Sequence, residues 1–264
     1  MIRLLKIEAL KNQTYRTFWI LTGLYFILLG MVTLGLRNFI GNITINGTQA
    51  TGIDLANLPF YQFPDIWHNI TYLAGFLKFI PAVMIIISIS NEYSYRTIRQ
   101  NIIDGLSKWE FVLSKLLGII LFSLVATLFM VAIGFYLGYA NTANITTGLI
   151  FQKSDFIPAF FMGLFTYLVF ALLVGTVIKR SGLAISLLLL YSLIIEPLIG
   201  LRLPETYSDY LPMAAVNKLI EFPFSRYLGQ EVQEKVKSIF MALSLGYAIL
   251  FCFLTYFYLS RKDL

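Results

Sequence analysis

The chain alternates between long apolar runs and shorter polar connections. A transmembrane helix needs about 20 mostly apolar residues, and six runs of about this length can be distinguished. The six predicted spans cover residues 18–36, 70–90, 113–138, 157–178, 183–201 and 239–259. The third run is longer than a bilayer requires, so we expect it to tilt or to project beyond the membrane. The pattern therefore predicts an all-α polytopic membrane protein with a single transmembrane domain over residues 1–264.

The connection between the second and third spans, residues 91–112, has a helical pattern of its own. Its apolar residues recur at the spacing of one face of an amphipathic helix. These residues are Tyr95, Ile98, Ile102 and Leu106. Gly105 is placed to end that helix, because glycine adopts the left-handed conformation without steric cost. Ser107 and Glu110 then match an S-x-x-E capping box, which predicts a sharp stop followed by a new helix.

Composition excludes a soluble protein. The chain is 58% hydrophobic and 13% charged, whereas a soluble domain carries about 25% charged residues. One cysteine, Cys252, and one histidine, His68, rule out a disulfide framework and a cysteine or histidine metal cluster. We expect His68 to lie in an interfacial loop. Intramembrane catalysis needs clustered His, Asp, Glu or Ser at bilayer depth, so we expect no catalytic residues and no metal site.

Basic residues are unevenly distributed between the two sets of connections that alternate along the chain. They are dense in the short N-terminal segment, in the loop over residues 91–112, in the Lys179–Arg180 turn and in the C-terminal tail, and sparser in the longer loops. The positive-inside rule then predicts that both termini are cytoplasmic. The net charge of +6 is explained by topology, so the expected partner is the lipid bilayer and not nucleic acid. On the outer side, residues 202–238 contain two short helical patterns, at residues 213–220 and 231–237, which we expect to lie at or dip into the surface.

Two ionisable residues lie well inside predicted spans, Lys78 in the second and Glu196 in the fifth. Such residues are costly in a bilayer and are usually paired or face a transport path. Each lies about 20 Å from the cytoplasmic end of its span at 1.5 Å per residue. We therefore hypothesise a contact between Lys78 and Glu196, within one chain or between two chains. The alternative is that both side chains extend to the outer interface.

The organisation of the chain resembles that of the ABC-2-type permeases, the membrane subunits of a group of ABC exporters. The shared features are six spans, termini inside, a basic N-terminal segment, a structured cytoplasmic loop after the second span and a helical outer loop before the last. The connection between the second and third spans also resembles the family's loose E-x4-T-x-R…G…F-x3-K pattern. The residues that match it are Glu92, Thr97, Arg99, Gly105, Phe111 and Lys115.

The resemblance implies a type V exporter-like architecture in which a homodimer, or a heterodimer with a similar permease, docks on two separate ATPase subunits. Residues 1–17 would form an interfacial helix, and residues 91–106 would be the coupling helix that sits in a cleft of each ATPase. The residues implied in coupling are Glu92, Arg96, Thr97, Arg99, Gly105, Ser107, Glu110, Phe111 and Lys115. Because the chain has no G-x-x-x-x-G-K-[ST] phosphate loop, the partner would bind ATP and Mg, and we expect no cofactor in this chain.

The expected cargo follows from the near absence of charge in the spans. A narrow, largely apolar path favours a lipid-like, amphiphilic or peptide substrate over a small ion. The resemblance implies export, and we expect the membrane to be a bacterial plasma (inner) membrane. The alternative is a secondary transporter or channel without an ATPase partner, but such folds often show repeated halves, and spans 1–3 and 4–6 have no convincing similarity. For residues 91–112, the alternative is a basic loop that binds anionic lipid headgroups.

Overall fold

The computed structural model describes residues 15–46, 60–225 and 231–261, together with Glu8, Lys11 and Gln13. Within these residues the regular elements are helices, and no strand occurs. Six of the helical segments are long and apolar enough to cross a membrane. They are Arg16–Gly35, Ile66–Ser94, Lys108–Asn141, Thr147–Ile178, Ser181–Arg202 and Ser238–Arg261. This confirms the predicted all-α fold with six transmembrane helices.

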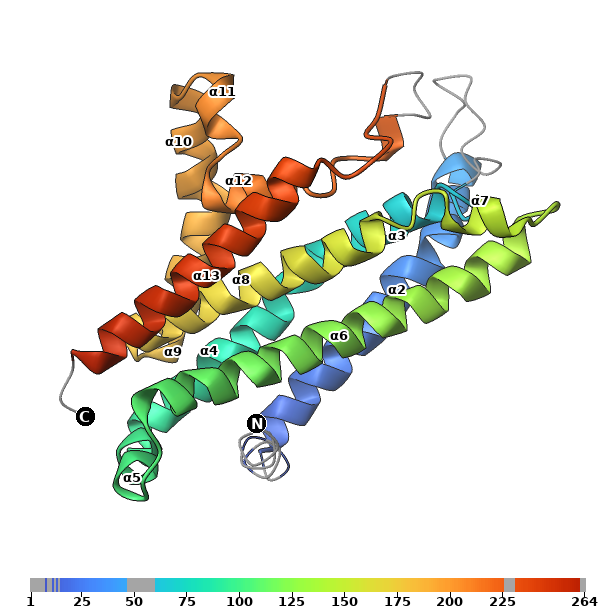
Figure 1. The fold of residues 1–264 in the computed structure, drawn as a ribbon. Helices are drawn as coiled ribbons and strands as arrows, with labels where there is room; N and C mark the ends of the chain where they lie inside the picture. Colours follow the sequence, from blue (N-terminus) through green and yellow to red (C-terminus); the bar gives the residue numbers. More distant parts are fainter. Residues whose placement is uncertain are drawn as a thin grey trace.

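Some spans consist of more than one helical element (Figure 1). A 3-10 turn, η2, interrupts the second span, and a π-helical turn, η3, interrupts the fifth. The elements are α2 (Arg16–Asn46), α3 (Ile66–Gly75), η2 (Phe76–Lys78), α4 (Phe79–Ser94), α5 (Thr97–Ile103), α6 (Lys108–Asn141), α7 (Thr147–Phe151), α8 (Phe156–Ile178), α9 (Ser181–Leu190), η3 (Tyr191–Ile195), α10 (Glu196–Arg202), α11 (Glu205–Ser208), α12 (Pro212–Asn217) and α13 (Ser238–Ser260).

Helix α8 forms the centre of the bundle. It packs against α3, α4, α6, α9, α12 and α13, and Figure 1 shows it running between α13 and α6. Gly175 permits the close approach of α8 to α4, because a Cβ atom at this position would lie 2.4 Å from Ile89 Cγ2. Small residues serve this purpose in membrane helices, where tight van der Waals packing takes the place of a hydrophobic driving force.

Helix α6 is the longest element. Its 34 residues span about 51 Å at 1.5 Å per residue, more than the hydrocarbon core of about 30 Å. This length agrees with the expectation that the third span projects beyond the membrane or tilts within it. Helices α5 and α7 therefore lie at opposite ends of the molecule (Figure 1).

The second half of the fifth span leaves the bundle. Helix α10 makes its main contacts with η3, α11 and α12, and α10 and α11 project away from the other spans in Figure 1. Helix α12 in turn packs against α8 and α13. The diverging segment is thus connected to the bundle through α12.

Only one of the two short helices expected at residues 213–220 and 231–237 forms. Helix α12 corresponds to the first pattern, but residues 231–237 are not helical, so the second expectation is wrong. The N–H of Val236 donates to Asp155 Oδ2 at 2.7 Å, and Gln233 Nε2 donates to the carbonyl of Leu219. Hydrogen bonds to other parts of the chain replace those that a helix would make.

His68 is buried within α3, so its assignment to an interfacial loop is wrong. Its Nε2 lies 2.8 Å from the carbonyl oxygen of Glu221, and its ring stacks on Phe156 with centroids 4.1 Å apart. The neighbouring Asn69 donates to the carbonyl of Phe60. These partners satisfy the hydrogen-bonding groups of His68 and Asn69. Helix α3 can therefore begin at Ile66, before the predicted span that starts at residue 70.

Candidate functional site

The connection between α4 and α6 contains the short helix α5. Arg96 adopts the left-handed conformation, with φ of 55°, and so separates α4 from α5. Ile98 is buried, and Ile102 packs partly buried against the core. Tyr95 lies outside α5 and is exposed, so its place on the predicted apolar face is wrong. Helix α4 continues through Ser94, and the turn at Arg96 changes the direction in which the following residues face.

The end of α5 and the start of α6 have the geometry that the sequence predicts. Gly105 has φ of +93°. Its N–H donates to the carbonyl of Ile102 at 3.0 Å, and the N–H of Leu106 donates to that of Asn101 at 2.9 Å, which is a Schellman motif. A capping box follows, in which the N–H of Glu110 donates to Ser107 Oγ at 3.2 Å, and the N–H of Ser107 donates to Glu110 Oε2 at 2.9 Å. Hydrogen bonds therefore hold both the helix stop and the restart.

A buried ion-pair network anchors this connection to the spans. The ammonium of Lys115, on α6, donates to Glu8 Oε2 at 2.9 Å and also to Glu92 Oε1, near the end of α4. Lys11 Nζ lies 3.4 Å from the same Glu92 oxygen, and Ser114 Oγ donates to Glu8 Oε1 at 3.2 Å. The Lys115 side chain is only 8% exposed. Two lysines and two carboxylates thus join the N-terminal segment, α4 and α6 with no net charge.

The network keeps Glu8 ionised. Burial by itself would raise the pKa of Glu8, but the charges of Lys115 and Lys11, with hydrogen bonds from Lys115 and Ser114, outweigh it and lower the pKa below the ordinary value of 4.5. A buried lysine without such partners would be strongly unfavourable. The three chain segments are therefore held together by charges that are costly to separate.

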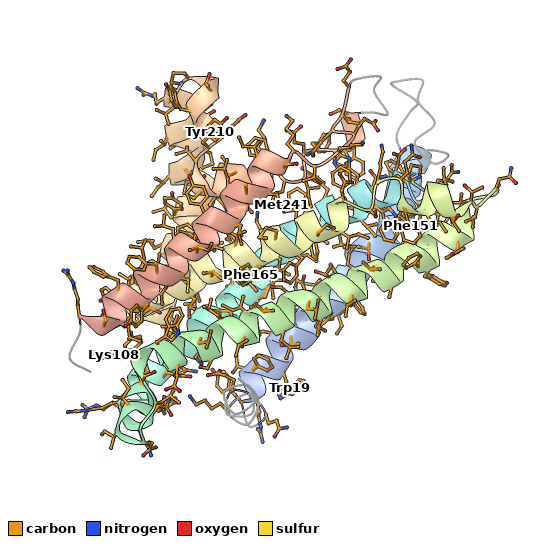
Figure 2. The ribbon with its side chains drawn as sticks, in the orientation of Figure 1. Trp19, Lys108, Phe151, Phe165, Tyr210 and Met241 are labelled. Atoms are coloured by element: carbon orange, nitrogen blue, oxygen red, sulfur yellow. The ribbon has the colours of Figure 1, made fainter. Side chains whose placement is uncertain are left out.

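The opposite face of α5 is exposed. Arg96 and Arg99 are exposed, and Ile103 is 76% exposed. At the start of α6, Trp109 is also partly exposed, and its ring packs edge-on against Tyr256 of α13. An exposed surface that combines arginine, aromatic and aliphatic side chains is typical of a protein-binding site. In Figure 2 this end of the molecule, near Lys108, carries charged side chains that point away from the bundle.

The structure brings together some of the sequence-predicted residues and separates others. Thr97 Oγ1 donates to the carbonyl of Glu92 at 3.3 Å, and Lys115 Nζ lies 5.7 Å from the centroid of the Phe111 ring. Gly105, Ser107 and Glu110 shape the turn, while Arg96 and Arg99 face outward. Sequence reasoning missed Glu8 and Lys11. The available signal was that Glu8 is the one acidic residue among residues 1–17, since an acid in a basic segment is a candidate partner for a buried lysine.

Lys78 and Glu196 do not form the predicted contact within one chain. Lys78 Nζ donates to Asn217 Oδ1 at 2.7 Å, and Glu196 Oε1 accepts from the N–H of Ala214 at 2.6 Å. No ion pair within 4 Å joins the two charges among the described residues. The prediction is wrong for the single chain because α12 inserts between the spans and supplies a partner to each; a contact between two chains stays a prediction.

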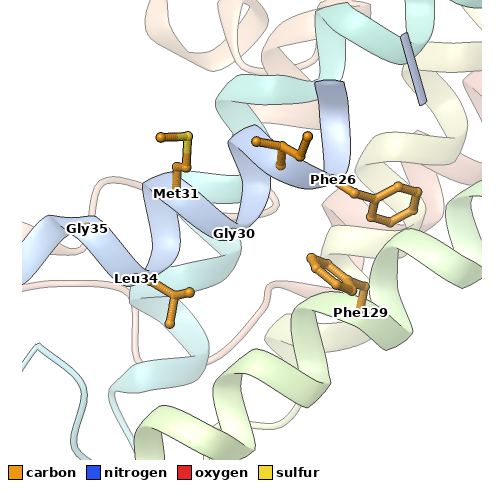
Figure 3. Close-up of a pocket in the computed structure, with 7 residues that line it drawn as sticks. Phe26, Gly30, Met31, Leu34, Gly35 and Phe129 are labelled. Carbon is orange, nitrogen blue, oxygen red and sulfur yellow. The ribbon is translucent and has the colours of Figure 1, made fainter. Parts of the chain in front are cut away.

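An apolar groove of about 630 Å³ lies between α2 and α6 (Figure 3). Phe26 of α2 and Phe129 of α6 line it and pack edge-on against each other, with ring centroids 5.1 Å apart. Its remaining lining residues are Ile27, Gly30, Met31, Leu34 and Gly35. The groove contains no titratable group, and no cluster of three or more His, Cys, Asp or Glu suited to a metal occurs in the described part of the chain.

Six apolar spans, with a short helix anchored between the second and third, define a multi-pass membrane protein. A profile of the ABC-2 family transporter proteins matches residues 67–256. The chain belongs to this family, which confirms the resemblance seen in its sequence. It is therefore a transport subunit of an ABC transporter and not itself a catalytic chain. A search of the curated proteins found no match.

Proposed function

We propose that the chain is the permease of an ATP-driven exporter and that α5 is the coupling helix that docks on a separate ATPase subunit. The observation that carries this proposal is the combination of an exposed α5 face with a buried anchor. Helix α5 is delimited by the turns at Arg96 and Gly105, and Lys115 ties the adjoining helices together. A helix held in this way passes a displacement to both spans and does not absorb it in a flexible loop.

The route of the displacement follows from the ion pairs. The turn at Arg96 joins α5 to the end of α4, where Glu92 lies, and Glu92 bonds to Lys115 on α6. Removing one member of a buried pair costs about 3–5 kcal/mol. A push on α5 therefore moves α4 and α6 as one body, together with the N-terminal segment that carries Glu8.

The proposed partner has matching chemistry. Arg96, Arg99 and Ile103 fit an apolar cleft with acidic residues at its rim. The partner subunits bind ATP and Mg, and two permease copies pair with two ATPase subunits. Both termini lie in the cytoplasm of a bacterial cell, in keeping with the distribution of Lys and Arg, and an amphiphilic, lipid-like or peptide cargo moves outward.

Co-purification tests the proposal. We expect the tagged chain, expressed with an ABC ATPase subunit of its own genome, to capture that subunit and hydrolyse ATP. Ile103→Asp should lower the capture at least about tenfold, because it places an unpaired carboxylate at the centre of the contact. Tyr207→Asp is the matched control, since Tyr207 is an exposed aromatic residue on α11, far from α5. Equal capture by Ile103→Asp and wild type would contradict the docking role, and a failure to bind any ATPase would favour a secondary transporter or channel.

Cysteine labelling tests the orientation. In a Cys252→Ser background, Asp104→Cys at the end of α5 and Glu231→Cys before the last span each provide one thiol. A membrane-impermeant maleimide should label Glu231→Cys in intact cells, and Asp104→Cys only after permeabilisation. The reverse pattern would contradict the cytoplasmic position of α5.

A further inference from the structure

Lys78 presents a charge in the middle of the second span. It lies about 18 Å from Ile66 and about 24 Å from Ser94 along the helix, at 1.5 Å per residue. Its ammonium donates to Asn217 Oδ1 at 2.7 Å and sits 5.1 Å from the centroid of the Tyr167 ring. Both partners are neutral. No carboxylate oxygen lies within 4 Å of the ammonium among the described residues.

Glu196 makes no direct contact with Lys78, although the two charges attract each other at longer range. It is only 2% exposed, and its Oε1 accepts the N–H of Ala214 in α12. Asn217, which accepts from Lys78, is exposed, and Lys78 itself is half-buried. Charged groups inside a membrane are normally paired in direct contact, and Lys78 has no such ion pair among the described residues.

The open groups at this position are hydrogen-bond donors. A lysine ammonium has three N–H donors and no acceptor, and one of them is used by Asn217. The oxygen of Asn217 is occupied by that bond, which leaves its amide NH2 group to donate outward. The exposed neighbours Phe76 and Phe79 are apolar. Donors and a positive charge in an apolar setting match the anionic head group of an amphiphile.

The backbone around this position is irregular. Lys78 ends the 3-10 turn η2, and the π-helical turn η3 comes directly before Glu196. Mid-helix departures of these kinds often occur at functional sites. Both interrupted spans bond to α12, one through the side chain of Asn217 and the other through the N–H of Ala214. One irregular turn therefore ends at the donor Lys78, and the other precedes Glu196, which bonds to the same helix α12.

We propose that Lys78 and Asn217 form a binding site for the anionic head group, a phosphate or carboxylate, of an amphiphile. As a site for cargo, it identifies where the proposed exporter binds the head group of its substrate, and in that role it rests on the proposed function. A resident anionic membrane lipid presents the same chemistry, so the test separates the two sources.

The site is tested on the full chain alone, in phosphatidylcholine nanodiscs, with spin-labelled phosphatidylglycerol and spin-labelled phosphatidylcholine as probes. Wild type should hold the anionic probe at least about fivefold more tightly than the zwitterionic one. Lys78→Met should abolish this preference, and Lys78→Arg should keep it. Lys218→Met is the matched control, because Lys218 follows Asn217 in the chain but has Asp209 as its own partner.

Asn217→Asp separates ligand binding from a purely structural role. The substitution preserves the contact with Lys78 and adds a counter-ion, so the thermal stability should be kept while the preference for the anionic probe is lost. Unchanged binding by Lys78→Met or Asn217→Asp, or no preference in wild type, would overturn the proposal.

ATP hydrolysis by the complex reconstituted with its ATPase distinguishes a cargo head group from that of a resident lipid. If the site takes cargo, dodecyl phosphate should stimulate ATP hydrolysis in wild type but not in Asn217→Asp, whereas dodecylphosphocholine should stimulate neither. Probe binding without this stimulation supports the anion site and assigns it to a resident lipid. Probe binding by a chain that captures no ATPase would support the anion site while contradicting the exporter function.

Discussion

Lys115 and Glu8 are separated by 107 positions in the sequence, and yet the Lys115 ammonium lies 2.9 Å from Glu8 Oε2 in a buried setting. The same ammonium donates to Glu92. The charge of one lysine therefore holds the N-terminal segment, the end of α4 and the start of α6 in a fixed relation. This is the joint at which a displacement of α5 would enter the spans.

Replacing Lys115 by Met should destabilise the protein strongly. The substitution leaves the buried carboxylates Glu8 and Glu92 without their main partner, which should cost about 3–5 kcal/mol. Denaturant unfolding in detergent measures this loss. Lys108→Met is the control, because Lys108 donates to the carbonyl of Ser260 at an exposed position, and it should change stability by less than about 1 kcal/mol. A Lys115→Met protein as stable as wild type would show that the network contributes nothing.

The same joint should weaken in acid. Since the folded-state pKa of Glu8 is lowered below 4.5, its ion pair contributes stability above that pH and loses it as the pH falls through the folded-state value. Thermal unfolding between about pH 7 and pH 3 should show a decline that begins below 4.5. Glu8→Gln should be less stable than wild type near neutrality, and the difference should shrink as the pH falls. A difference that is independent of pH would contradict the pairing.

Gly105→Ala should disturb the turn between α5 and α6. At φ of +93° an alanine is strained, at a cost of about 1–2 kcal/mol. Denaturant unfolding measures this loss of stability. The expected loss of coupling is measured as a lower ratio of cargo moved to ATP hydrolysed. Gly182→Ala, in α9, adds a methyl group to open space at an ordinary helical position. If both variants behave alike, the conformation of Gly105 is not important.

Gly175→Val should separate α8 from α4. A Cβ at this position would lie 2.4 Å from Ile89 Cγ2 and 3.4 Å from Ile86 Cα, so the larger side chain forces the helices apart, at a cost of about 1–3 kcal/mol. Gly246→Ala on α13 meets nothing within 4 Å and should be tolerated. The melting temperatures of the two variants in detergent provide the comparison, and equal values would contradict the close packing.

Local rules explain why much of the candidate site could be predicted. The stop at Gly105 and the cap formed by Ser107 and Glu110 depend on residues close together in the sequence, and both have the predicted geometry. Tyr95 was misplaced because α4 runs on to Ser94 and Arg96 takes up a left-handed conformation. An arginine gives no local signal for that conformation, since it is favourable mainly for glycine and asparagine.

Long-range partners could not be predicted. Matching depths suggested a contact between Lys78 and Glu196, but α12 folds back between the spans and binds both. Similarly, His68 is buried because Glu221 and Phe156 come from distant parts of the chain. Hydrophobic periodicity determines where a helix forms, but it does not specify which polar groups in the connections will reach it.

The sequence by itself determined the number of spans, the class of protein and the helix boundary at Gly105, because crossing a bilayer depends on length and hydropathy and a turn depends on local backbone conformation. The tertiary structure alone decided that Glu8 pairs with Lys115, that α12 bonds to two spans, and that Lys78 donates to Asn217 and not to Glu196. Ion pairs and hydrogen bonds act over a few ångströms, and those distances exist only after the helices have packed.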